Sequence, residues 1–565
     1  RLLGYVGRHR KLIGLSLVAM VTAAGVDLLL PEIVKRTVDG PILGGRPDEL
    51  PMYGIAFIGV LLLGMAIRAA RAVISVAAGR EIGMSLRMDV FEHIQRMSLR
   101  FFDKHPVGVL STRVTSDVEA IEQFFSSGVA AFFHDILKLL LILVVLFVVN
   151  AQLALVVCSV LPILAIATLI FTRRSRRDFG TVRTETARAN GFTTEAINGI
   201  RVTRVFGREP NANERFAEHT QTLQDAHFRT IRNFAFFFPT VNVLSSLAVT
   251  LVIHFGSVQI LGGGFTFGEF FQFWFLIEYF FQPIRTLSDN VNMMLQATVS
   301  GERLFAVLDT PPEIEDDEEP VDGAAMRGRA TFEDVHFGYV PSEPVLRGVS
   351  FDVEPGTTVA LVGPTGAGKT SVLNLISRFY DVQLGCVRVD GVDVRHYDHD
   401  SLRSRIAIVL QDVFLFRGSV LDNIRLFDES ISRDEVEAAV RAVHADRVVG
   451  RLPGGLDASI EERGANLSVG ERQLIAFARA LVHDPAILVL DEATSSIDTE
   501  TELLIQDALE TMRRGRTTIV VAHRLSTIRA ADKILVLKRG QVVEQGDHKT
   551  CLLYTSDAAD EHRDV

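Results

Sequence analysis

The amino-acid sequence predicts a multi-domain chain, with an all-α domain of six transmembrane helices followed by an α/β domain of the P-loop NTPase fold. Three observations support this prediction. The 565 residues exceed the ~250–300 residues that one hydrophobic core usually serves. The mean hydropathy of +0.25 is unusual for a soluble protein of this length. Long apolar runs recur only up to about Thr286, and a glycine-rich phosphate loop lies in the second half.

The composition argues against several classes of protein. The 58 Lys and Arg residues and the 69 Asp and Glu residues give a net charge of −11, so we expect no nucleic-acid partner. Three cysteines without a Cys-x-x-Cys spacing cannot form a disulfide framework. The first apolar run is too long for a cleavable signal peptide. The positive mean hydropathy predicts the lipid bilayer as a partner instead.

Six apolar runs are each close to the ~20 residues that cross the hydrocarbon core of a bilayer. Basic residues gather before the first run, between the second and the third, and after the fourth. The positive-inside rule then places both termini and two long connections in the cytoplasm. The expected location is the cytoplasmic (inner) membrane of a bacterium. The predicted spans are Leu12–Val34, Met52–Ala78, Val129–Val149, Leu153–Phe171, Thr240–Ile260 and Phe265–Arg285.

The two long connections also carry a helical pattern. Glu81–Met97 and Thr181–Ile197 contain no proline and repeat apolar residues at helical spacing. At a rise of 1.5 Å per residue, helices continued this far reach roughly 35–40 Å beyond the bilayer. We therefore expect spans two to five to extend as helices well into the cytoplasm.

Ionisable residues inside the apolar runs have two possible roles. A charge in hydrocarbon costs several kcal/mol, so it usually faces a bundle interior or a water-filled cavity. Such residues either line a substrate pathway or pair between helices, and both interpretations stay open here. Glu278 is the strongest candidate for a pathway, and two of the arginines are expected near the inner interface. The residues are Asp27, Arg68, Arg71, Lys138 and Glu278.

An acidic, proline-containing segment separates the two halves. Asp309–Asp322 cannot build a core, and we expect it to be a solvated connector. Alternating short strands begin at about Ala330. The predicted domains are residues 10–308 for the transmembrane domain, 309–328 for the linker and 329–550 for the α/β domain.

The strand Val359–Val362 runs into a Gly-x-x-x-x-Gly-Lys-Thr phosphate loop, and a helix-like segment follows. Glycines let backbone N–H groups turn towards phosphate oxygens, and the helix N-terminus adds its partial positive charge. Lys369 is expected to reach the β- and γ-phosphates of ATP, and Thr370 to offer its hydroxyl to Mg²⁺. The predicted nucleotide-binding residues of this loop are Gly363, Pro364, Thr365, Gly366, Ala367, Gly368, Lys369, Thr370 and Ser371.

A second buried strand, Ile487–Leu490, ends in two acids. An acid at this position, Asp491, can hold Mg²⁺ through water. The next acid, Glu492, is expected to polarise the attacking water as the general base of ATP hydrolysis. The distance of this pair from the phosphate loop makes the signal strong.

The segment Leu467–Gln473 resembles the signature motif of ATP-binding cassette (ABC) proteins, usually written Leu-Ser-Gly-Gly-Gln. It departs from that motif at Val469 and Glu471. The resemblance implies that Ser468 and Gly470 approach a γ-phosphate, with Glu471 beside them at the nucleotide.

Other elements of the same family match in order. The resemblance implies that Tyr339 stacks on adenine, that Gln411 contacts Mg²⁺, that Asp498 lies in the loop after the catalytic acid, and that His523 is the switch histidine at the γ-phosphate. Glu462–Gly464 resembles the exporter-type segment before the signature.

The membrane half resembles that of ABC exporters. Phe101–Asp117 and Glu195–Glu209 look like the two cytoplasmic coupling segments. Six spans before one nucleotide-binding domain is the half-transporter arrangement. The resemblance therefore implies a second chain, identical or different, because each ATP lies between the phosphate loop of one chain and the signature of the other. Ser468, Gly470 and Asp498 would then act on the partner's nucleotide.

The function implied by the resemblance is ATP-driven export or flipping of an amphipathic substrate of the drug or lipid class. Aromatic-rich stretches, Phe234–Phe238 and Phe270–Phe281, are consistent with a hydrophobic cavity. The transported substrate itself is not identified by the sequence. Transport of a defined polar solute or peptide is the alternative, and an ATP-gated channel or regulatory membrane ATPase is disfavoured by the intact Glu492.

Both ends of the chain depart from expectation. The chain starts at Arg1 rather than Met, so we expect its natural N-terminus to lie further upstream. Cys551–Glu561 resembles a translated sequencing adapter, and the family's closing helix is expected where Cys551–Val565 stands. We therefore interpret this tail as an artefact.

Overall fold

The computed structural model describes residues 2–491, 499–522 and 525–551. The chain divides into two compact units. The first, which we call the helical unit, consists of Arg1–Gln95 and Val107–Thr310. The second, the α/β unit, consists of Arg96–Pro106 and Pro311–Val565. A short segment of the first half of the sequence, Arg96–Pro106, thus belongs to the α/β unit.

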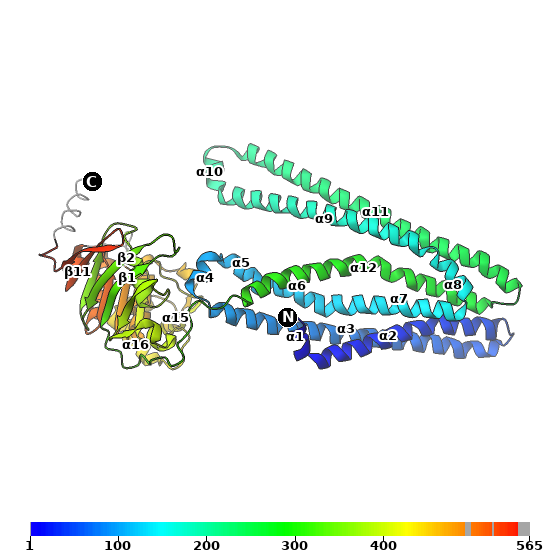
Figure 1. The fold of residues 1–565 in the computed structure, drawn as a ribbon, viewed down its shortest axis with the longest axis horizontal. Coiled ribbons are helices and arrows are strands. Elements are labelled where there is room, and N and C mark those ends of the chain that lie inside the picture. Colours follow the sequence, from blue (N-terminus) through cyan, green and yellow to red (C-terminus); the bar gives the residue numbers. More distant parts are fainter. Residues whose placement is uncertain (1, 492–498, 523–524, 552–565) are drawn as a thin grey trace. The chain divides into compact units, whose positions relative to one another are not determined.

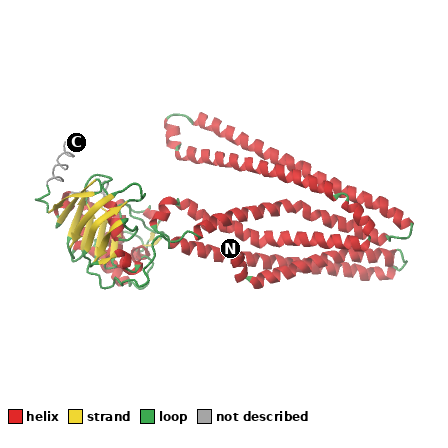
Figure 2. Ribbon diagram, viewed as in Figure 1, coloured by secondary structure: helices red, strands yellow, loops and turns green. Residues whose placement is uncertain are grey.

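The helical unit is built from long helices, and its described residues form no strand (Figure 2). Three single turns of π-helix, Val38–Ile42, Arg113–Asp117 and Phe124–Gly128, lie before α7. The longest helix, α11, has 53 residues and is therefore about 80 Å long. The α-helices are α1 (Leu2–Arg8), α2 (Arg10–Thr37), α3 (Leu50–Gln95), α5 (Val107–Thr112), α6 (Val118–Gln123), α7 (Val129–Val149), α8 (Ala151–Cys158), α9 (Leu161–Asn198), α10 (Ile200–Val205), α11 (Glu209–Leu261) and α12 (Phe267–Leu308).

The structure confirms that the spans continue as helices. Helix α3 runs through most of Glu81–Met97, and α9 contains all of Thr181–Ile197. Helices α9 and α11 form a long hairpin, with α10 at its end (Figure 1). At the opposite end, Asn150 separates α7 from α8 and caps α8, because its Oδ1 accepts a hydrogen bond from Leu153 N at 3.1 Å.

Five helical segments of the described residues are long and apolar enough to cross a membrane. The sixth predicted span, Phe265–Arg285, corresponds to the first part of α12, which packs against α2, α7 and α11. Polar residues such as Glu269 and Gln272 lower the hydropathy of α12, so composition alone does not select it. The five segments are Arg10–Ile42, Pro47–Gln95, Val107–Val149, Ala151–Asn198 and Glu209–Leu261.

The α/β unit contains a six-stranded sheet in the order β12-β11-β3-β10-β9-β6, in which only β12 is antiparallel to its neighbour. A four-stranded antiparallel sheet, β2-β1-β4-β5, packs beside it around a shared core. The strands are β1 (Ala330–Phe337), β2 (Leu346–Val353), β3 (Thr358–Val362), β4 (Leu384–Val389), β5 (Val392–Asp393), β6 (Ile406–Val409), β7 (Gly418–Ser419), β8 (Ser459–Ile460), β9 (Ile487–Asp491), β10 (Thr517–Val521), β11 (Lys533–Lys538) and β12 (Gln541–Gly546).

Most helices of this unit form a second core with the other face of the large sheet, whereas Val372 of the phosphate-loop helix and Leu402 belong to the first core. The buried runs of β9 and β10 are apolar on both faces, as expected of parallel strands covered on both sides. The helices are α4 (Leu99–Lys104), α13 (Lys369–Ile376), α14 (His399–Ser404), α15 (Val420–Arg425), α16 (Arg433–Ala442), α17 (Asp446–Val449), α18 (Val469–Val482), α19 (Thr499–Arg513) and α20 (Leu525–Arg529). The predicted fold class, a helical membrane domain followed by an α/β domain, is confirmed.

Candidate functional site

The phosphate loop lies between the central strand β3 and α13. Strand β3 is hydrogen-bonded to β11 on one side and to β10 on the other, which fixes the start of the loop. Gly366 and Gly368 have φ of +81° and +100°, a region that favours glycine. A Cβ on Gly368 would lie 2.5 Å from the Leu346 side chain. The loop conformation therefore depends on these glycines.

Lys369 is buried at the first position of α13. Its Nζ donates hydrogen bonds to the carbonyl oxygens of Gly363, at 2.6 Å, and Pro364, at 3.1 Å. Burial lowers the pKa of Lys369, and the Asp491 carboxylate opposes that change. Backbone carbonyls are neutral acceptors, and charge-assisted bonds to phosphate are stronger. The ammonium group is thus hydrogen-bonded to neutral carbonyl oxygens of the loop, which the oxygens of a bound anion can replace.

The three residues predicted to bind Mg²⁺, Thr370, Gln411 and Asp491, come from segments that meet at one edge of the sheet. In the parallel strands Val521 lies opposite both Leu361 and Asp491, and Leu490 lies opposite Val409. The carboxyl ends of β3, β9, β10 and β6 therefore share an edge. Asp491 ends β9 there, Gln411 follows β6 by two residues, and Thr370 is exposed beside Lys369.

These three side chains fit Mg²⁺. Carboxylate, hydroxyl and amide oxygens are the ligands that Mg²⁺ prefers, and Mg²⁺ usually takes few protein ligands together with substrate phosphates. Among the described residues, no group of three or more His, Cys, Asp or Glu is clustered for a metal. Glu492, Asp498 and His523, which the sequence places at this site, lie outside the described residues.

Tyr339 lies next to the phosphate-loop helix. Its hydroxyl is 3.2 Å from Ser371 Oγ and accepts a hydrogen bond from Asn374 Nδ2 at 3.0 Å. Its partly exposed ring packs edge-on against Phe337 and Tyr380, with centroid distances of 5.0 and 5.1 Å. The aromatic ring predicted to contact adenine is thus anchored to α13 on one side and to Tyr380 on the other.

The signature segment forms the start of α18, and two of its residues make a capping box. Ser468 Oγ accepts a hydrogen bond from Glu471 N at 3.2 Å, and Glu471 Oε2 accepts one from Ser468 N at 2.8 Å. The sequence predicts Glu471 at the nucleotide, as a departure from the motif, but the motif comparison does not predict this cap. The Ser-x-x-Glu spacing before an apolar helix was the signal for this cap.

The residues before the signature form a tight turn beside Gln411. Arg463 and Gly464 both have positive φ, of +57° and +67°. The Arg472 guanidinium donates to the carbonyl oxygen of Leu467 at 2.9 Å, which holds the turn against α18. A cavity of about 420 Å³ separates this turn from the segment after β6, and it is lined by Gln411, Asp412, Val413, Phe414, Arg463, Val469, Arg472 and Gln473.

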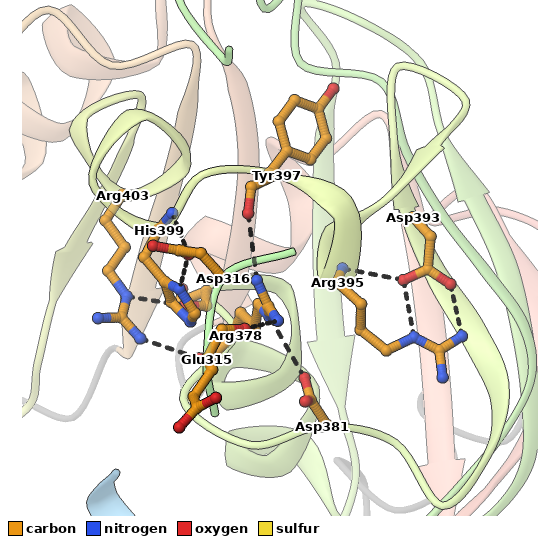
Figure 3. Close-up of polar contacts among 10 residues, drawn as sticks. Glu315, Asp316, Arg378, Asp381, Asp393, Arg395, Tyr397, His399 and Arg403 are labelled. Carbon is orange, nitrogen blue, oxygen red and sulfur yellow. Dashed lines mark hydrogen bonds and ion pairs between the residues drawn. The ribbon is translucent and has the colours of Figure 1, made fainter. Parts of the chain in front are cut away.

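The acidic linker is mostly exposed, as predicted, but it is also tethered. His399 donates to the Asp316 carboxylate through its backbone N, at 3.0 Å, and its ring nitrogen also contacts Asp316 (Figure 3). Asp317 is 2.7 Å from the ring nitrogen of His396. The buried Arg378 donates to the carbonyl oxygen of Glu315 at 3.0 Å. Composition did not predict these bonds, because their partners lie far away in the sequence.

Segment Arg96–Pro106 also makes contacts that the sequence did not predict. Tyr380 Oη donates to Asp103 Oδ2 at 2.7 Å. Burial, together with the hydrogen bond to Asp103, raises the pKa of Tyr380. Arg100 donates to Glu313 Oε1 at 2.6 Å, and its guanidinium lies 5.9 Å from the centre of the Tyr380 ring. Asp103 of the first predicted coupling segment is therefore bonded to a residue beside Tyr339, and Arg100, directly before that segment, is bonded to the linker.

Two family descriptions match the chain. Residues 13–284 match "ABC transporter transmembrane region", and residues 346–495 match "ABC transporter". A solved structure of a bacterial Atm1-family ABC exporter with ATP bound superposes with a TM-score of 0.82, at 27% sequence identity and 98% coverage of both chains.

Curated relatives match over nearly the whole chain. An uncharacterized ABC transporter ATP-binding protein of Bacillus subtilis is 38% identical over 98% of this chain and 92% of its own length. A fatty acid ABC transporter ATP-binding/permease protein of Mycobacterium bovis is 38% identical over 89% of this chain and 81% of its own. An ATP-dependent lipid A-core flippase of Syntrophus aciditrophicus is 36% identical, over 98% and 92%.

Proposed function

Because the chain belongs to the ABC transporter family, and its ATPase is thus coupled to transport, we propose that it exports or flips an amphipathic substrate. The observation that supports this most strongly is the match to exporters along nearly the entire chain, membrane half included. Two relatives act, by their names, on fatty acid and on lipid A-core, which are both amphipathic. The proposed substrate class is therefore lipid or drug.

The proposed ATP site uses the residues predicted from sequence. The phosphate loop, residues 363–371, would hold the phosphates with Lys369, and Tyr339 would contact the base. Thr370, Gln411 and Asp491 would hold Mg²⁺, which neutralises phosphate charge when bound. Glu492 is the proposed general base, with His523 as its partner at the γ-phosphate.

A dimer of half-transporters is the proposed working unit, since ABC exporters of this fold are typically dimeric. Ser468, Gly470, Glu471 and Asp498 would then face the nucleotide of the second chain. Helix α10 supports this proposal, because it and the next residue expose apolar side chains: Val202 is 63%, Val205 80% and Phe206 72% exposed. Exposed apolar surface of this kind is typical of a protein contact. Both an identical and a different second chain fit this proposal.

The chain is a multi-pass membrane protein. We propose α12 as its sixth span, because its apolar residues Phe273, Leu276 and Ile277 are fully buried against its helical neighbours. The proposed membrane is the cytoplasmic (inner) membrane of a bacterium, with both termini and the α/β unit in the cytoplasm. We propose further that the transmembrane domain ends at residue 308 and that the nucleotide-binding domain spans residues 329–550.

Reconstitution into liposomes tests the proposed function. The purified protein would be added to liposomes that contain nitrobenzoxadiazole-labelled phosphatidylglycerol, and dithionite would report which leaflet holds the label. We expect ATP to move the label across the bilayer, and Glu492→Gln to retain ATP binding while abolishing movement and turnover. ATP-independent conductance would identify a channel, and near-wild-type turnover in Glu492→Gln would refute the assigned base.

A further inference from the structure

Charged side chains gather in the apolar part of the helical unit, where α2, α3 and α7 pack together. Arg68 Nη1 donates to Asp27 Oδ1 at 2.7 Å, and Lys138 Nζ lies 3.6 Å from Asp27 Oδ2. Lys138 also donates to Gln282 Oε1 of α12 at 3.2 Å, and its ammonium lies 4.7 Å from the centre of the Tyr279 ring. One carboxylate thus serves two cations from two other helices.

A third cation and a histidine lie one helical turn away, on the cytoplasmic side in the proposed topology. Arg71 follows Arg68 by three residues on α3, and His134 precedes Lys138 by four residues on α7. This spacing places both members of each pair on one helix face. Electrostatic interactions link His134 to Arg71, Lys138 and Asp27. We call Arg68, Arg71, His134 and Lys138 the cationic cluster.

Two atoms of the cationic cluster are left without a partner. Nε of Arg71 and Nδ1 of His134 are both buried, and neither finds a hydrogen-bond partner among the described residues. A buried polar atom without a partner is destabilising, and in a native protein it usually marks a place where a water, an ion or a ligand binds. Because a guanidinium only donates, the group that satisfies Arg71 must be an acceptor.

The cluster also carries more positive than negative charge. Among the described side chains, its three permanent cations share one buried carboxylate, Asp27. Two further carboxylates stand on α7 and α12, but neither bonds a member of the cluster. Asp135 accepts a hydrogen bond from Asn290 Nδ2 at 3.2 Å, and Glu278 is exposed. Since a net charge inside a bilayer is costly unless an opposite charge or water meets it, the acceptor that fits best is an anion.

The depth of the cluster suits the head group of an amphiphile. Arg71 lies seven residues before the end of the second predicted span at Ala78, which corresponds to roughly 10 Å along the helix. His134 lies five residues after the start of α7. The Arg68 side chain is 42% exposed and Arg71 is partly exposed, so a molecule in the inner half of the bilayer has access to the cluster.

An aromatic surface continues outward from the cluster along α12. Gln282, which bonds Lys138, lies on the same side of α12 as Phe271, Trp274 and Phe275, because the spacing of these residues is helical. All three rings are exposed in the single chain. An amphiphile with its head at the cationic cluster would lay its chain along these rings.

We propose that the cationic cluster binds the anionic head group of the transported amphiphile, with Arg71 and His134 as its direct contacts. This inference rests on the proposed transport function and narrows its substrate class to amphiphiles with a phosphate or carboxylate head. Oxygens of either anion accept the hydrogen bonds that Arg71 Nε and the Nδ1-protonated tautomer of His134 offer. A head group that adds a positive charge is disfavoured, because it brings that charge to three cations.

Trp274 reports binding directly, because it is the single tryptophan of the sequence and lies on the aromatic surface. The full-length protein in phosphatidylcholine nanodiscs would be titrated with lysophosphatidylglycerol that carries a brominated chain, which quenches tryptophan on contact. Lysophosphatidylcholine with the same chain provides the head group without net charge. No ATP is added, so a failure of transport leaves this result intact.

We expect the wild type to bind the glycerol probe about tenfold more tightly than the choline probe, which matches one hydrogen bond between charged groups. Inorganic phosphate should displace the glycerol probe far less well than unbrominated lysophosphatidylglycerol does, because it has no chain to bury. Equal displacement by the two would assign the cluster to a free anion and overturn the proposal. Equal affinity for the two probes would overturn it as well.

Arg71→Gln should weaken binding of the glycerol probe about tenfold and leave the choline probe unaffected, whereas Arg71→Lys should retain part of the preference. The matched control is Arg80→Gln, which removes an exposed arginine of the same helix nine residues further along. Equal affinities of Arg71→Gln and Arg80→Gln for the glycerol probe would refute the role of Arg71. The comparison of the two probes in the wild type decides alone if Arg71→Gln does not fold.

The liposome assay separates this inference from the transport function on which it rests. With ATP, the wild type should move labelled phosphatidylglycerol across the bilayer and leave phosphatidylcholine with the same label in place. Movement of neither lipid, together with preferential binding of the glycerol probe, would contradict transport and keep the anion site. Equal movement of both lipids would support transport and contradict the anion site.

Discussion

The two units bury charge in different ways. In the α/β unit, Lys369 is held by the carbonyl oxygens of Gly363 and Pro364. In the helical unit, Asp27 accepts a hydrogen bond from Arg68 at 2.7 Å and lies 3.6 Å from Lys138. The first cation has neutral partners, whereas the carboxylate in the membrane half is paired with two cations from two other helices.

This difference separates a binding site from a structural contact. A cation on neutral carbonyls gains by exchanging them for phosphate oxygens. A carboxylate between two cations is already satisfied and ties α2, α3 and α7 together. Of the two interpretations of the charges inside the spans, pairing therefore applies to Asp27, Arg68 and Lys138. Glu278 is exposed in the single chain and stays the candidate for a pathway.

The largest expected effect comes from the membrane half. Asp27→Asn leaves Arg68 and Lys138 without their counter-charge, and breaking a buried ion pair from one side costs about 3 kcal/mol or more. We expect a clearly lower Tm in scanning fluorimetry of the purified protein. The double variant Asp27→Asn/Lys138→Met removes the more buried cation as well and should recover part of the loss. An unchanged Tm in the single variant would show that this cluster does not stabilise the bundle.

Lys369→Ala tests the role of the buried cation in the α/β unit. It should leave the fold intact and weaken ATP binding roughly 100-fold, because charge-assisted bonds to two phosphates are lost. Lys533→Ala is the matched control, since Lys533 Nζ also donates to a backbone carbonyl, that of Asp352 at 3.1 Å. The ATP-dependent thermal shift should disappear at moderate ATP in the first variant only. Equal ATP affinity in both would contradict the assigned role of Lys369.

The tether of the linker should depend on pH. Burial raises the pKa of Asp316, but the hydrogen bonds from His399 outweigh it and hold the pKa below the usual 3.8. The hydrogen bond from His396 likewise lowers the pKa of Asp317. A carboxylate whose pKa is lowered in the folded state stabilises that state fully at pH values above its usual pKa. This stabilisation is lost as the pH falls through the lowered pKa.

We therefore expect the linker to stay tethered at neutral pH and to loosen only below about 3.8. Hydrogen exchange of residues 311–322, corrected for the intrinsic effect of pH, measures this. Asp316→Asn/Asp317→Asn is the control and should be loose at neutral pH as well. A linker that loosens already near neutral pH would show that other groups hold it.

Local patterns were predicted well, and distant contacts were not. The phosphate loop and the acid that ends β9 are recognisable because each belongs to a run of consecutive residues. The bond between Tyr380 and Asp103 joins residues 277 positions apart, and that between His399 and Asp316 spans 83. Such pairs depend on how the chain folds back, which no periodicity encodes. The length of α9 and α11 was predictable because it depends only on local spacing, whereas the polar residues of α12 weakened its membrane signal.

The smallest expected effects concern the signature. Ser468→Ala removes one half of the capping box and should lower stability by about 1 kcal/mol, read as a small decrease of Tm. Glu471→Gln restores the residue usual in the family and keeps an acceptor at the third helical position, so Tm should change very little. Glu471→Ala, which removes that acceptor, is the control and should resemble Ser468→Ala.

The same three variants also separate capping from nucleotide contact at the signature. If Glu471 serves only α18, then Glu471→Gln leaves ATP turnover unchanged as well, because the cap orients Ser468 equally with either side chain. If the charge of Glu471 acts on the nucleotide of the second chain, turnover changes while Tm does not. A difference in ATP turnover between Glu471 and Gln at equal Tm would therefore assign the departure at this position to catalysis, and equal turnover would assign it to the helix.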